Sequence, residues 1–457
     1  MDGDFNLIEL LTEKRSEATI IWLCNIGAEK YWHACNQGIV DKKEDILSGK
    51  MEEMNLLLCR EQDILILMEP PDPEFLKALR EFGFSIPRVL VPQSNAGNNL
   101  ALSISDLVLQ DESLQDELKK ISDLTNDTYF IPYAVTEMEE KIAEKCCLKL
   151  IGPPSSVSRE VNSKLFSREI AVTLGLPVSE GIICHSVDEI RDAYFQLTQR
   201  GTIFDKVIVK EPYGASGKGL YLIRNKNLLN STLAVISRFA ARAGNNTWLV
   251  EGWYDSKTDI NYQIYISPSG KVSLFSIKEQ VLNGVIYKGS IINSRCISEK
   301  IYEDYSKAAV SIGNYLFQWG YTGVASIDSI MVGGEKIIPI IEINGRFSLS
   351  TYISFLFGAG EEDMAMSFYY RVKSKDIIEF SAVYNMLKIE GILFDPKKKE
   401  GVFVYSSATL PRKCDVKQSE VFSGRIFVLI KAKSPERVEQ YKQIFENRVG
   451  RIFLSMN

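Results

Sequence analysis

Two apolar segments that meet at a pair of glycines constrain the fold of this chain more than any other feature. Residues 325–331 and 337–346 are rich in isoleucine and read as neighbouring β-strands, with Gly333-Gly334 as the turn between them. A chain of 457 residues is too long for one core, because single cores stop growing at about 250–300 residues. We therefore expect these strands to belong to one of two or three packed α/β layers.

The second of these segments carries polar side chains at alternate positions. A strand period of two aims Glu342, Asn344 and Arg346 at one face, which Asp328 on the first strand can join. Two carboxylates and an amide oxygen are the hard ligands that Mg²⁺ takes together with substrate phosphates. The charged Arg346 can hold an acyl phosphate or the oxyanion of its breakdown. The alternative is an exposed strand face with scattered charge, although carboxylates brought together there would repel each other.

A glycine-rich loop follows another predicted strand. The apolar run 207–209 leads to Lys210, and the next strand begins at Leu220. Glycines let backbone N–H groups approach phosphate oxygens, while lysines supply positive charge. The loop is neither a Walker A motif nor a G-x-G-x-x-G turn that opens a helix, and a hairpin turn with solvated lysines is the alternative. The residues that we expect near a triphosphate are Lys210, Gly214, Ser216, Gly217, Lys218 and Gly219.

Together these features resemble the ATP-grasp superfamily, in which two α+β lobes clamp ATP between them. The resemblance covers about residues 162–352, and its motifs come in the order typical of the family. It implies that Lys164 is the first ATP lysine and that the strand 248–252 is the hinge beside the adenine, with Asp259 or Asn261 near the ribose. The site that the resemblance implies comprises Lys164, Lys210, Gly214–Gly219, Glu251, Gly252 and Asp259 for ATP, Asp328, Glu342 and Asn344 for the metal, and Arg346 for catalysis.

A narrower resemblance extends over nearly the whole chain. The stretches 25–32, 67–76 and 280–290 are similar to the pre-ATP-grasp ligases of natural-product pathways. This resemblance implies a fold of class α/β and α+β: an ATP-grasp fold preceded by a Rossmann-like pre-ATP-grasp domain and followed by a small α+β lobe. It implies ATP with Mg²⁺, or Mn²⁺ in its place. The implied acid is an amino acid, with L-glutamate favoured, and the implied acceptor is an acyl-carrier protein, with a free peptide amine as the alternative.

Turn-forming residues divide the chain into parts. The first part alternates short β-rich runs with helical patterns, which predicts a small parallel sheet. Residues 180–370 read mostly as strands. The elements that the pattern predicts are strands at 19–24, 64–68, 89–91, 401–406 and 425–432, and helices near 75–79, 166–174, 306–319 and 434–449. The expected domains are a pre-ATP-grasp α/β domain at 1–154, an ATP-grasp domain at 155–372 and a C-terminal α+β lobe at 373–457.

Composition argues against several other classes. The net charge of −6 gives no basic footprint for nucleic acid, and no apolar run reaches the roughly 20 residues that span a bilayer. We therefore expect a cytosolic protein without a nucleic-acid or membrane partner. The eight cysteines include no C-x-x-C pair, which favours free thiols over zinc or disulfides. Because His33 and His185 are the only histidines, chemistry built on histidine is not expected.

The expected reaction is ligation through an acyl phosphate. A carboxylate attacks the γ-phosphate of ATP, with Lys164, Lys210, Lys218 and the metal spreading the charge. An amine or thiol then displaces phosphate, and Lys288 and Arg295 are candidates to assist Arg346, although a solvated role suits Lys288 equally. Two rivals are a regulatory protein that only binds ATP and a kinase-like phosphotransferase. The full set of metal ligands beside an arginine argues against the regulatory protein.

Basic residues near the C-terminus provide a possible contact for the acceptor. An acyl-carrier protein is typically acidic, so a basic margin would attract it at low salt. The alternative is the solvated face of a helix that also carries glutamates. The basic residues are Lys431, Lys433, Arg437, Lys442, Arg448 and Arg451.

Overall fold

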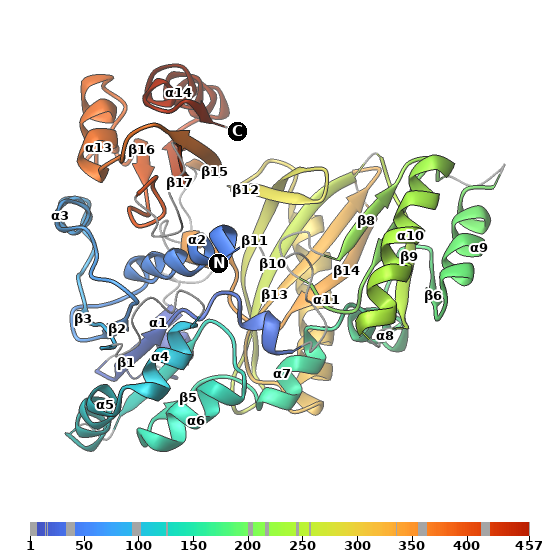
Figure 1. Ribbon diagram of the computed structural model, residues 1–457, viewed down its shortest axis with the longest axis horizontal. Helices are drawn as coiled ribbons and strands as arrows, with labels where there is room; N and C mark the ends of the chain where they lie inside the picture. The colour runs from blue at the N-terminus through green and yellow to red at the C-terminus, as the bar shows by residue number, and fades with distance from the viewer. Residues whose placement is uncertain are drawn as a thin grey trace.

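The computed structural model of the chain contains three β-sheets in the residues that it describes. A parallel sheet and a small antiparallel sheet lie at opposite ends of the molecule, and a long antiparallel sheet lies between them (Figure 1). The described residues are 7–13, 15, 17–32, 42–93, 102–124, 127–199, 204–214, 219–243, 246–255, 257–334, 336–354, 363–412 and 421–456.

The first sheet is parallel, with the order β3-β2-β1-β4-β5. Its central strands are mostly apolar and bury both faces, as is typical of a parallel sheet covered by helices. The prediction of a parallel sheet here is confirmed. Its strands are β1 (Thr19–Leu23), β2 (Ile64–Ile66), β3 (Arg88–Leu90), β4 (Thr128–Pro132) and β5 (Lys149–Leu150). The helices of this part are α1 (Leu7–Leu11), η1 (Ala28–Tyr31), α2 (Lys42–Gly49), η2 (Lys50–Leu57), α3 (Pro73–Glu81), α4 (Ile104–Gln110), α5 (Glu112–Leu124) and α6 (Glu137–Lys145).

The small antiparallel sheet has the order β6-β9-β7-β8 and carries two helices. The predicted strand before the glycine-rich loop and the strand after it are both present, as β7 and β8. Neither helix is among the predicted elements, although the buried Leu229, Leu233 and Ile236 of the second one recur at helical spacing. The elements are β6 (Gly181–Cys184), α9 (Val187–Leu197), β7 (Val207–Lys210), β8 (Leu220–Ile223), α10 (Lys226–Ala243) and β9 (Trp248–Gly252).

The long sheet has nine strands, in the order β14-β13-β10-β11-β12-β15-β17-β16, with β18 paired to β15. All of its pairs are antiparallel, and the predicted hairpin at Gly333-Gly334 forms β13 and β14. Its strands are β10 (Lys257–Ile266), β11 (Val272–Asn283), β12 (Ile286–Ile292), β13 (Gly323–Val332), β14 (Lys336–Asn344), β15 (Met364–Ser374), β16 (Gly401–Val404), β17 (Phe422–Ala432) and β18 (Ser455–Met456).

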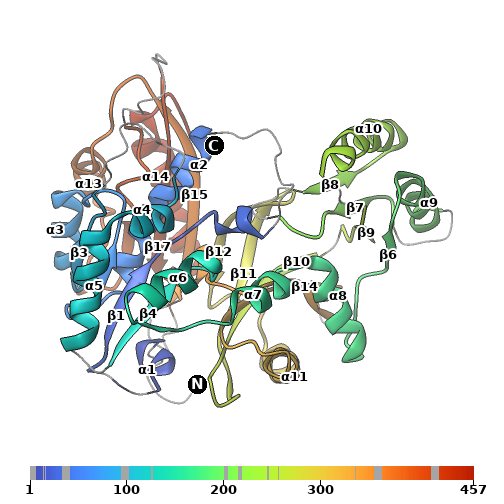
Figure 2. The same ribbon diagram turned by 60° about the horizontal axis from the view of Figure 1, so that its bottom comes forward.

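At the end of this sheet that contains β10, β13 and β14, helices cover one face and leave the opposite face polar, whereas β17 at the other end buries apolar side chains on both faces. α8 and α11 pack on an apolar core that includes Ile260, Tyr262 and Ile327 (Figure 2). α11 begins earlier than predicted, because the Ser298 hydroxyl accepts a hydrogen bond from the Ile301 N–H and caps the helix there. The remaining helices are α7 (Ser155–Val161), α8 (Lys164–Thr173), α11 (Glu299–Gln318), α12 (Leu349–Ile353), α13 (Phe380–Ile389), α14 (Pro435–Arg448) and η3 (Val449–Ile452).

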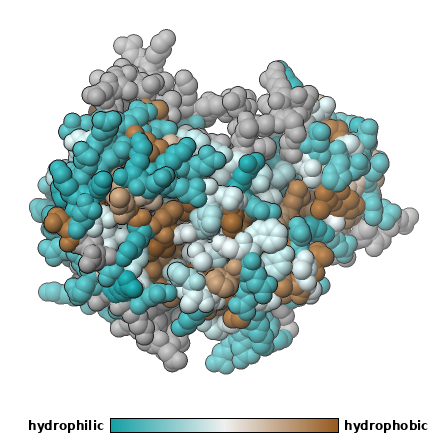
Figure 3. Space-filling model, turned by 90° about the horizontal axis from the view of Figure 1, so that it is seen from below, coloured by the Kyte–Doolittle hydropathy of each residue, from teal (hydrophilic) through white to brown (hydrophobic). Residues whose placement is uncertain are grey.

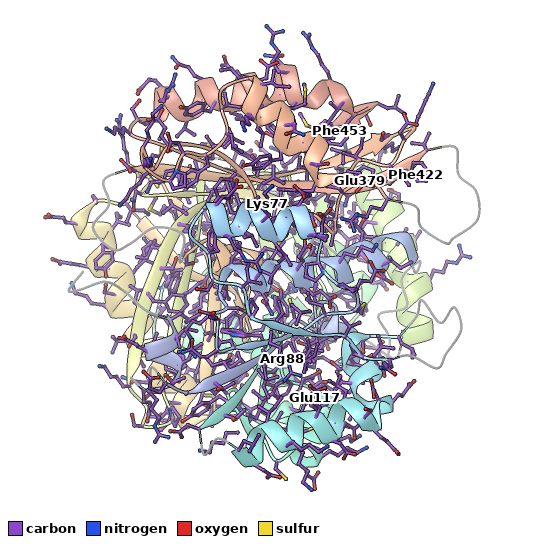
Figure 4. The ribbon with its side chains drawn as sticks, turned by 90° about the vertical axis from the view of Figure 1, so that its left-hand side faces the viewer. Lys77, Arg88, Glu117, Glu379, Phe422 and Phe453 are labelled. Atoms are coloured by element: carbon purple, nitrogen blue, oxygen red, sulfur yellow. The ribbon has the colours of Figure 1, made fainter. Side chains whose placement is uncertain are left out.

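The C-terminal segment packs on the N-terminal part. α3, which carries Lys77, lies below the C-terminal elements and above the parallel sheet (Figure 4). The rings of Phe75 and Phe380 are 5.0 Å apart in an edge-on contact. The buried Glu53 accepts hydrogen bonds from the backbone N–H groups of Ser407 and Ala408, at 2.6 and 2.8 Å. These contacts join segments that are far apart in the sequence.

The surface seen from below mixes hydrophilic side chains with separate apolar patches (Figure 3). Among the described residues, no helix has both the length and the apolar composition that a membrane span requires.

Candidate active site

The polar face of the long sheet is built by direct pairing across three strands. Asp328 on β13 pairs with Glu342 on β14 and with Asn261 on β10. The Asp328 carboxylate accepts hydrogen bonds from the amides of Asn261 and Gln280, both at 2.8 Å, and from the Asn344 amide at 3.2 Å. The predicted convergence of Asp328, Glu342 and Asn344 on one face is therefore present, and two further amides orient the central carboxylate.

The electrostatics of this face favour a bound cation. Burial, and then the Glu342 carboxylate, raise the pKa of Asp328 to about 6, while the amides of Asn261 and Gln280 favour its charged form. A divalent cation held by both carboxylates and the Asn344 oxygen would relieve this cost. Among the described residues, no three or more acidic, cysteine or histidine side chains are grouped so that they could hold a metal ion by themselves. The remaining ligands would therefore come from substrate phosphates and water.

Lys164 links the polar face to the glycine-rich loop. It begins α8, and its ammonium lies 3.0 Å from the Glu342 carboxylate and donates to the Gly214 carbonyl at 3.0 Å. The preceding Asn162 accepts a hydrogen bond from the Gly345 N–H at 3.1 Å. Ser167 in the next turn accepts one from the Ile343 N–H at 2.9 Å. The start of α8 is thus tied to β14 at three points, which brings a lysine to the side of the predicted metal ligands.

A second lysine is paired within the small sheet. Lys210 at the end of β7 contacts the Glu251 carboxylate on β9 at 2.5 Å, and Arg168 of α8 contacts the other Glu251 oxygen at 3.0 Å. All three residues are largely buried. Glu251 belongs to the predicted hinge strand, and the structure adds that its side chain pairs with Lys210. Gly252 follows, and a Cβ there would lie 2.5 Å from the ring of Phe204.

Arg346 is positioned differently from the prediction, because it lies beyond the end of β14. β14 ends at Asn344, so the alternation of a strand does not extend to Arg346, and this part of the prediction is wrong. The chain turns at Gly345, and the Arg346 guanidinium donates to the Tyr133 hydroxyl at 2.9 Å and lies 5.4 Å from the centre of its ring. The Phe347 N–H donates to the Tyr133 carbonyl at 3.0 Å. A tyrosine next to the parallel sheet therefore holds the arginine.

The other predicted site residues lie at the edges of this centre or outside the described ranges. Asp259 pairs with Lys257 on its own strand, and burial raises its pKa. The Lys288 ammonium lies 5.3 Å from the ring centre of Tyr369 on β15, and burial and Arg371 lower its pKa. Arg295 is exposed in the turn after β12 and lies near Glu436 of α14. The predicted residues outside the described ranges are Ser216, Gly217, Lys218 and His33.

Several contributors were not recognised in the sequence. Asn162 and Gln280 lie in segments that carry the family resemblance but have no predicted role, and the predicted role of Asn261 was a ribose contact. Tyr133 and Arg168 carried no local signal. Their roles arise from contacts between distant segments, which spacing along one strand or helix does not reveal. The cysteines of the described residues are free, as expected.

Lys164 lies beside the paired carboxylates, and Lys210 lies in the small sheet just before the glycine-rich loop; this arrangement suits phosphoryl transfer from a nucleotide. Family models agree: a pre-ATP-grasp domain matches residues 51–148, the ATP-binding domain of the carbamoyl-phosphate synthase L chain matches 164–355, and the PGM1 C-terminal domain matches 382–444. The [butirosin acyl-carrier protein]–L-glutamate ligase of Niallia circulans is 30% identical over 339 residues, which cover 73% of each chain. The chain belongs to the ATP-grasp ligases with a pre-ATP-grasp domain, and it is an ATP-dependent, ADP-forming carboxylate ligase.

More distant relatives share part of the sequence or only the fold. The alpha subunit of the mitochondrial methylcrotonoyl-CoA carboxylase of Arabidopsis thaliana is 25% identical over 46% of this chain and 28% of its own length. A biotin carboxylase from Campylobacter jejuni in complex with a β,γ-ATP ligand superposes with a TM-score of 0.58 at 12% identity, over 96% of this chain and 92% of that one. The biotin carboxylase domain of a Hydrogenobacter thermophilus enzyme with MgADP gives 0.52 at 13% identity, over 91% and 86%.

Proposed function

We propose that this ligase activates L-glutamate and transfers the glutamyl group to the thiol of an acyl-carrier protein, in the biosynthesis of an antibiotic or related natural product. The support for this substrate pair is the similarity to the butirosin-pathway ligase over most of both chains. The observation that carries the chemistry is the Lys164 bridge. One ammonium contacts both the Glu342 carboxylate and the Gly214 carbonyl, which supports a site in which the proposed phosphate loop and the proposed metal ligands act on one substrate.

The proposed first step forms an acyl phosphate. A carboxylate oxygen of the acid attacks the γ-phosphorus of ATP, the bond from that phosphorus to the β,γ-bridging oxygen breaks, and ADP leaves. Lys164 and Lys210 are placed to neutralise charge on the phosphate oxygens from the two sheets. To do so, each must exchange its present carboxylate partner, Glu342 or Glu251, for a phosphate oxygen.

We propose Asp328, Glu342 and Asn344 as the residues that hold Mg²⁺, which would neutralise phosphate charge when bound. The amides of Asn261 and Gln280 keep the Asp328 carboxylate aimed at the paired face. The fit rests on the donor set and on the raised pKa of Asp328, and Mn²⁺ has the same ligand preference. The ATP contacts proposed for Gly214, Gly219, Gly252 and Asp259 follow from their places around the loop and the hinge.

The proposed second step releases phosphate. The acceptor thiol attacks the acyl carbon, the bond from that carbon to the phosphate oxygen breaks, and the thiol proton is lost to solvent. Arg346 would stabilise the tetrahedral oxyanion, and its hydrogen bond to Tyr133 fixes the orientation of the guanidinium. We place Lys288 and Arg295 on the acceptor side, because they lie near β15 and α14.

The basic margin near the C-terminus is weaker than the sequence predicted. Lys431 is 3% exposed and pairs with Asp363, so it cannot form part of a surface margin. Arg437 pairs with Glu400, and Arg448 lies 3.9 Å from Glu390. Local carboxylates therefore offset much of this charge, and steering of a carrier protein would depend on the exposed Lys433 and Arg451. We expect only a modest salt dependence of carrier binding.

The direct test is to incubate the protein with Mg·ATP, L-glutamate and either the holo or the apo form of an acyl-carrier protein, and to weigh the products. A glutamyl mass increment on the holo form alone, with one ADP formed per transfer, supports the proposal. Ligation to free amino acids or peptides alone would contradict the proposed transfer to a carrier protein and would indicate a peptide ligase. Phosphorylated glutamate as the final product would point to a phosphotransferase.

A further inference from the structure

A buried lysine without a carboxylate partner lies beside the paired carboxylates. Lys278 on β11 is 2% exposed, and its ammonium donates to the hydroxyls of Ser276 and Ser354, each at 2.5 Å. Among the described residues, no carboxylate lies within 4.0 Å of it. Lys164 and Lys210, the other two buried lysines of this region, each pair with a glutamate. Lys278 therefore differs from them in having only neutral partners.

The register of the sheet puts Lys278 in line with the predicted metal ligands. Lys278 pairs with Asn261, Asn261 with Asp328, and Asp328 with Glu342, so one row crosses four strands. Residues paired across a sheet share a face, and Gln280, two positions along β11, contacts Asp328 from the same side. At about 4.8 Å per strand, Lys278 lies two strands, roughly 10 Å, from Asp328.

Polar side chains connect the two ends of this row. The Ser354 hydroxyl donates to the Ser350 carbonyl, and the Ser350 hydroxyl donates to the Asn261 oxygen at 2.9 Å. The Asn261 amide in turn reaches Asp328. The sheet face between Lys278 and the predicted metal ligands is therefore polar, and its side chains are buried, whereas the opposite face of the same strands packs in an apolar core.

The partners of Lys278 neither neutralise its charge nor use all of its hydrogen-bond donors. An ammonium has three donors, and the two serine hydroxyls use two of them. Burial lowers the pKa of Lys278 to about 7, and no neighbouring charge contributes to this shift. A buried amine in this state gains more from an incoming anion than a solvated lysine does, because the anion supplies both the missing acceptor and the missing charge.

We propose that Lys278 binds the non-reacting anionic group of the acid substrate, while the reacting carboxylate lies at Asp328 and Glu342. This inference rests on the proposed ligase function and narrows the acid to a small molecule with a second carboxylate, such as a dicarboxylic amino acid. The reason is the spacing along the row: the Lys278 ammonium at one end and Asp328 near the other are separated by about two strand spacings, which suits a small acid with two anionic groups. Lys278 would then select the acid without touching ATP.

The test compares Lys278→Met with Lys271→Met, which changes an exposed lysine in the turn before the same strand. Phosphate release is measured with L-glutamate as the varied substrate, at saturating ATP and holo carrier protein. L-glutamine and isoglutamine, which replace one or the other carboxylate by an amide, are then used in place of L-glutamate. KM for ATP is measured in parallel, since a general structural defect would raise it.

In Lys278→Met we expect KM for L-glutamate to rise at least about tenfold while KM for ATP stays within about twofold. The wild-type preference for L-glutamate over the amide of the non-reacting carboxylate should fall to about one in this variant, and Lys271→Met should behave as wild type. Unchanged KM and preference in Lys278→Met would overturn the inference, and so would a parallel rise in KM for ATP. A wild-type protein that uses a monocarboxylic acid equally well would also overturn it. Failure of the proposed function differs from these outcomes, because the wild type itself would then release no phosphate.

Discussion

Replacing Lys210 should both weaken ATP binding and destabilise the small sheet. Lys210 and Glu251 are 5% and 7% exposed at their side chains, and their charged atoms are 2.5 Å apart. Lys210→Met removes the charge and leaves Glu251 buried with Arg168 as its remaining partner at 3.0 Å. Breaking a buried pair costs about 3–5 kcal/mol, and we expect the lower end because Arg168 stays. Loss of the proposed phosphate contact should weaken ATP use at least tenfold, about 1.4 kcal/mol.

The double variant Lys210→Met/Glu251→Gln distinguishes the two effects. The neutral glutamine removes a buried carboxylate that has lost one of its two cationic partners, while Arg168 keeps the Ser179 and Gly181 carbonyls as acceptors, so urea unfolding should show part of the lost free energy of unfolding restored. KM for ATP should remain raised, because the lysine is still missing. Lys206→Met is the matched control, since Lys206 precedes the same strand in an exposed pair with Asp255 and should change stability by less than about 1 kcal/mol. A double variant with wild-type KM for ATP would refute a phosphate contact for Lys210 and leave it a structural role.

Three further predictions concern the polar face, the arginine and a buried carboxylate. Glu342→Gln should raise the Mg²⁺ concentration needed for half-maximal turnover at least about tenfold, since one anionic ligand is lost, and an unchanged Mg²⁺ titration would contradict the assignment. Tyr133→Phe keeps the ring beside Arg346 and removes the hydroxyl, so kcat should fall about tenfold with KM for ATP unchanged, whereas a rise in KM alone would contradict a role in the chemical step. Burial raises the pKa of Glu52 well above its ordinary value, so the folded state binds the extra proton and stability is lost as pH rises above about 4.5. The melting temperature of Glu52→Gln should therefore fall less than that of wild type between about pH 5 and about pH 8, and parallel curves would show that Glu52 is ionised.

Local patterns predicted the elements that bring the site together. The hairpin and its carboxylates follow from period-two alternation, and the strand before the glycine-rich loop follows from a short apolar run. Arg346 and Tyr133 are 213 positions apart, and neither has a pattern that points to the other. The same holds for Glu53 and Ser407, which join the N-terminal part to the C-terminal segment. The division at residues 154 and 372 stays a prediction, to which the structure adds that β15 crosses the second boundary and pairs with both β12 and β17.

The contacts of Tyr133 explain how the parallel sheet, which contributes no proposed metal or ATP ligand, can affect catalysis. Asn25, just after β1, holds Ala134 through two hydrogen bonds, from its amide to the Ala134 carbonyl at 2.8 Å and from the Ala134 N–H to its oxygen at 3.0 Å. The adjacent Tyr133 holds Arg346 by its hydroxyl and Phe347 by its carbonyl. Because the chain leaves β14 at Asn344, no strand pairing fixes the arginine beyond that point. The carboxyl edge of the parallel sheet thus supports the guanidinium. A change that shifts Tyr133 should therefore lower kcat, through the proposed stabilisation of the oxyanion by Arg346, before it raises KM for ATP.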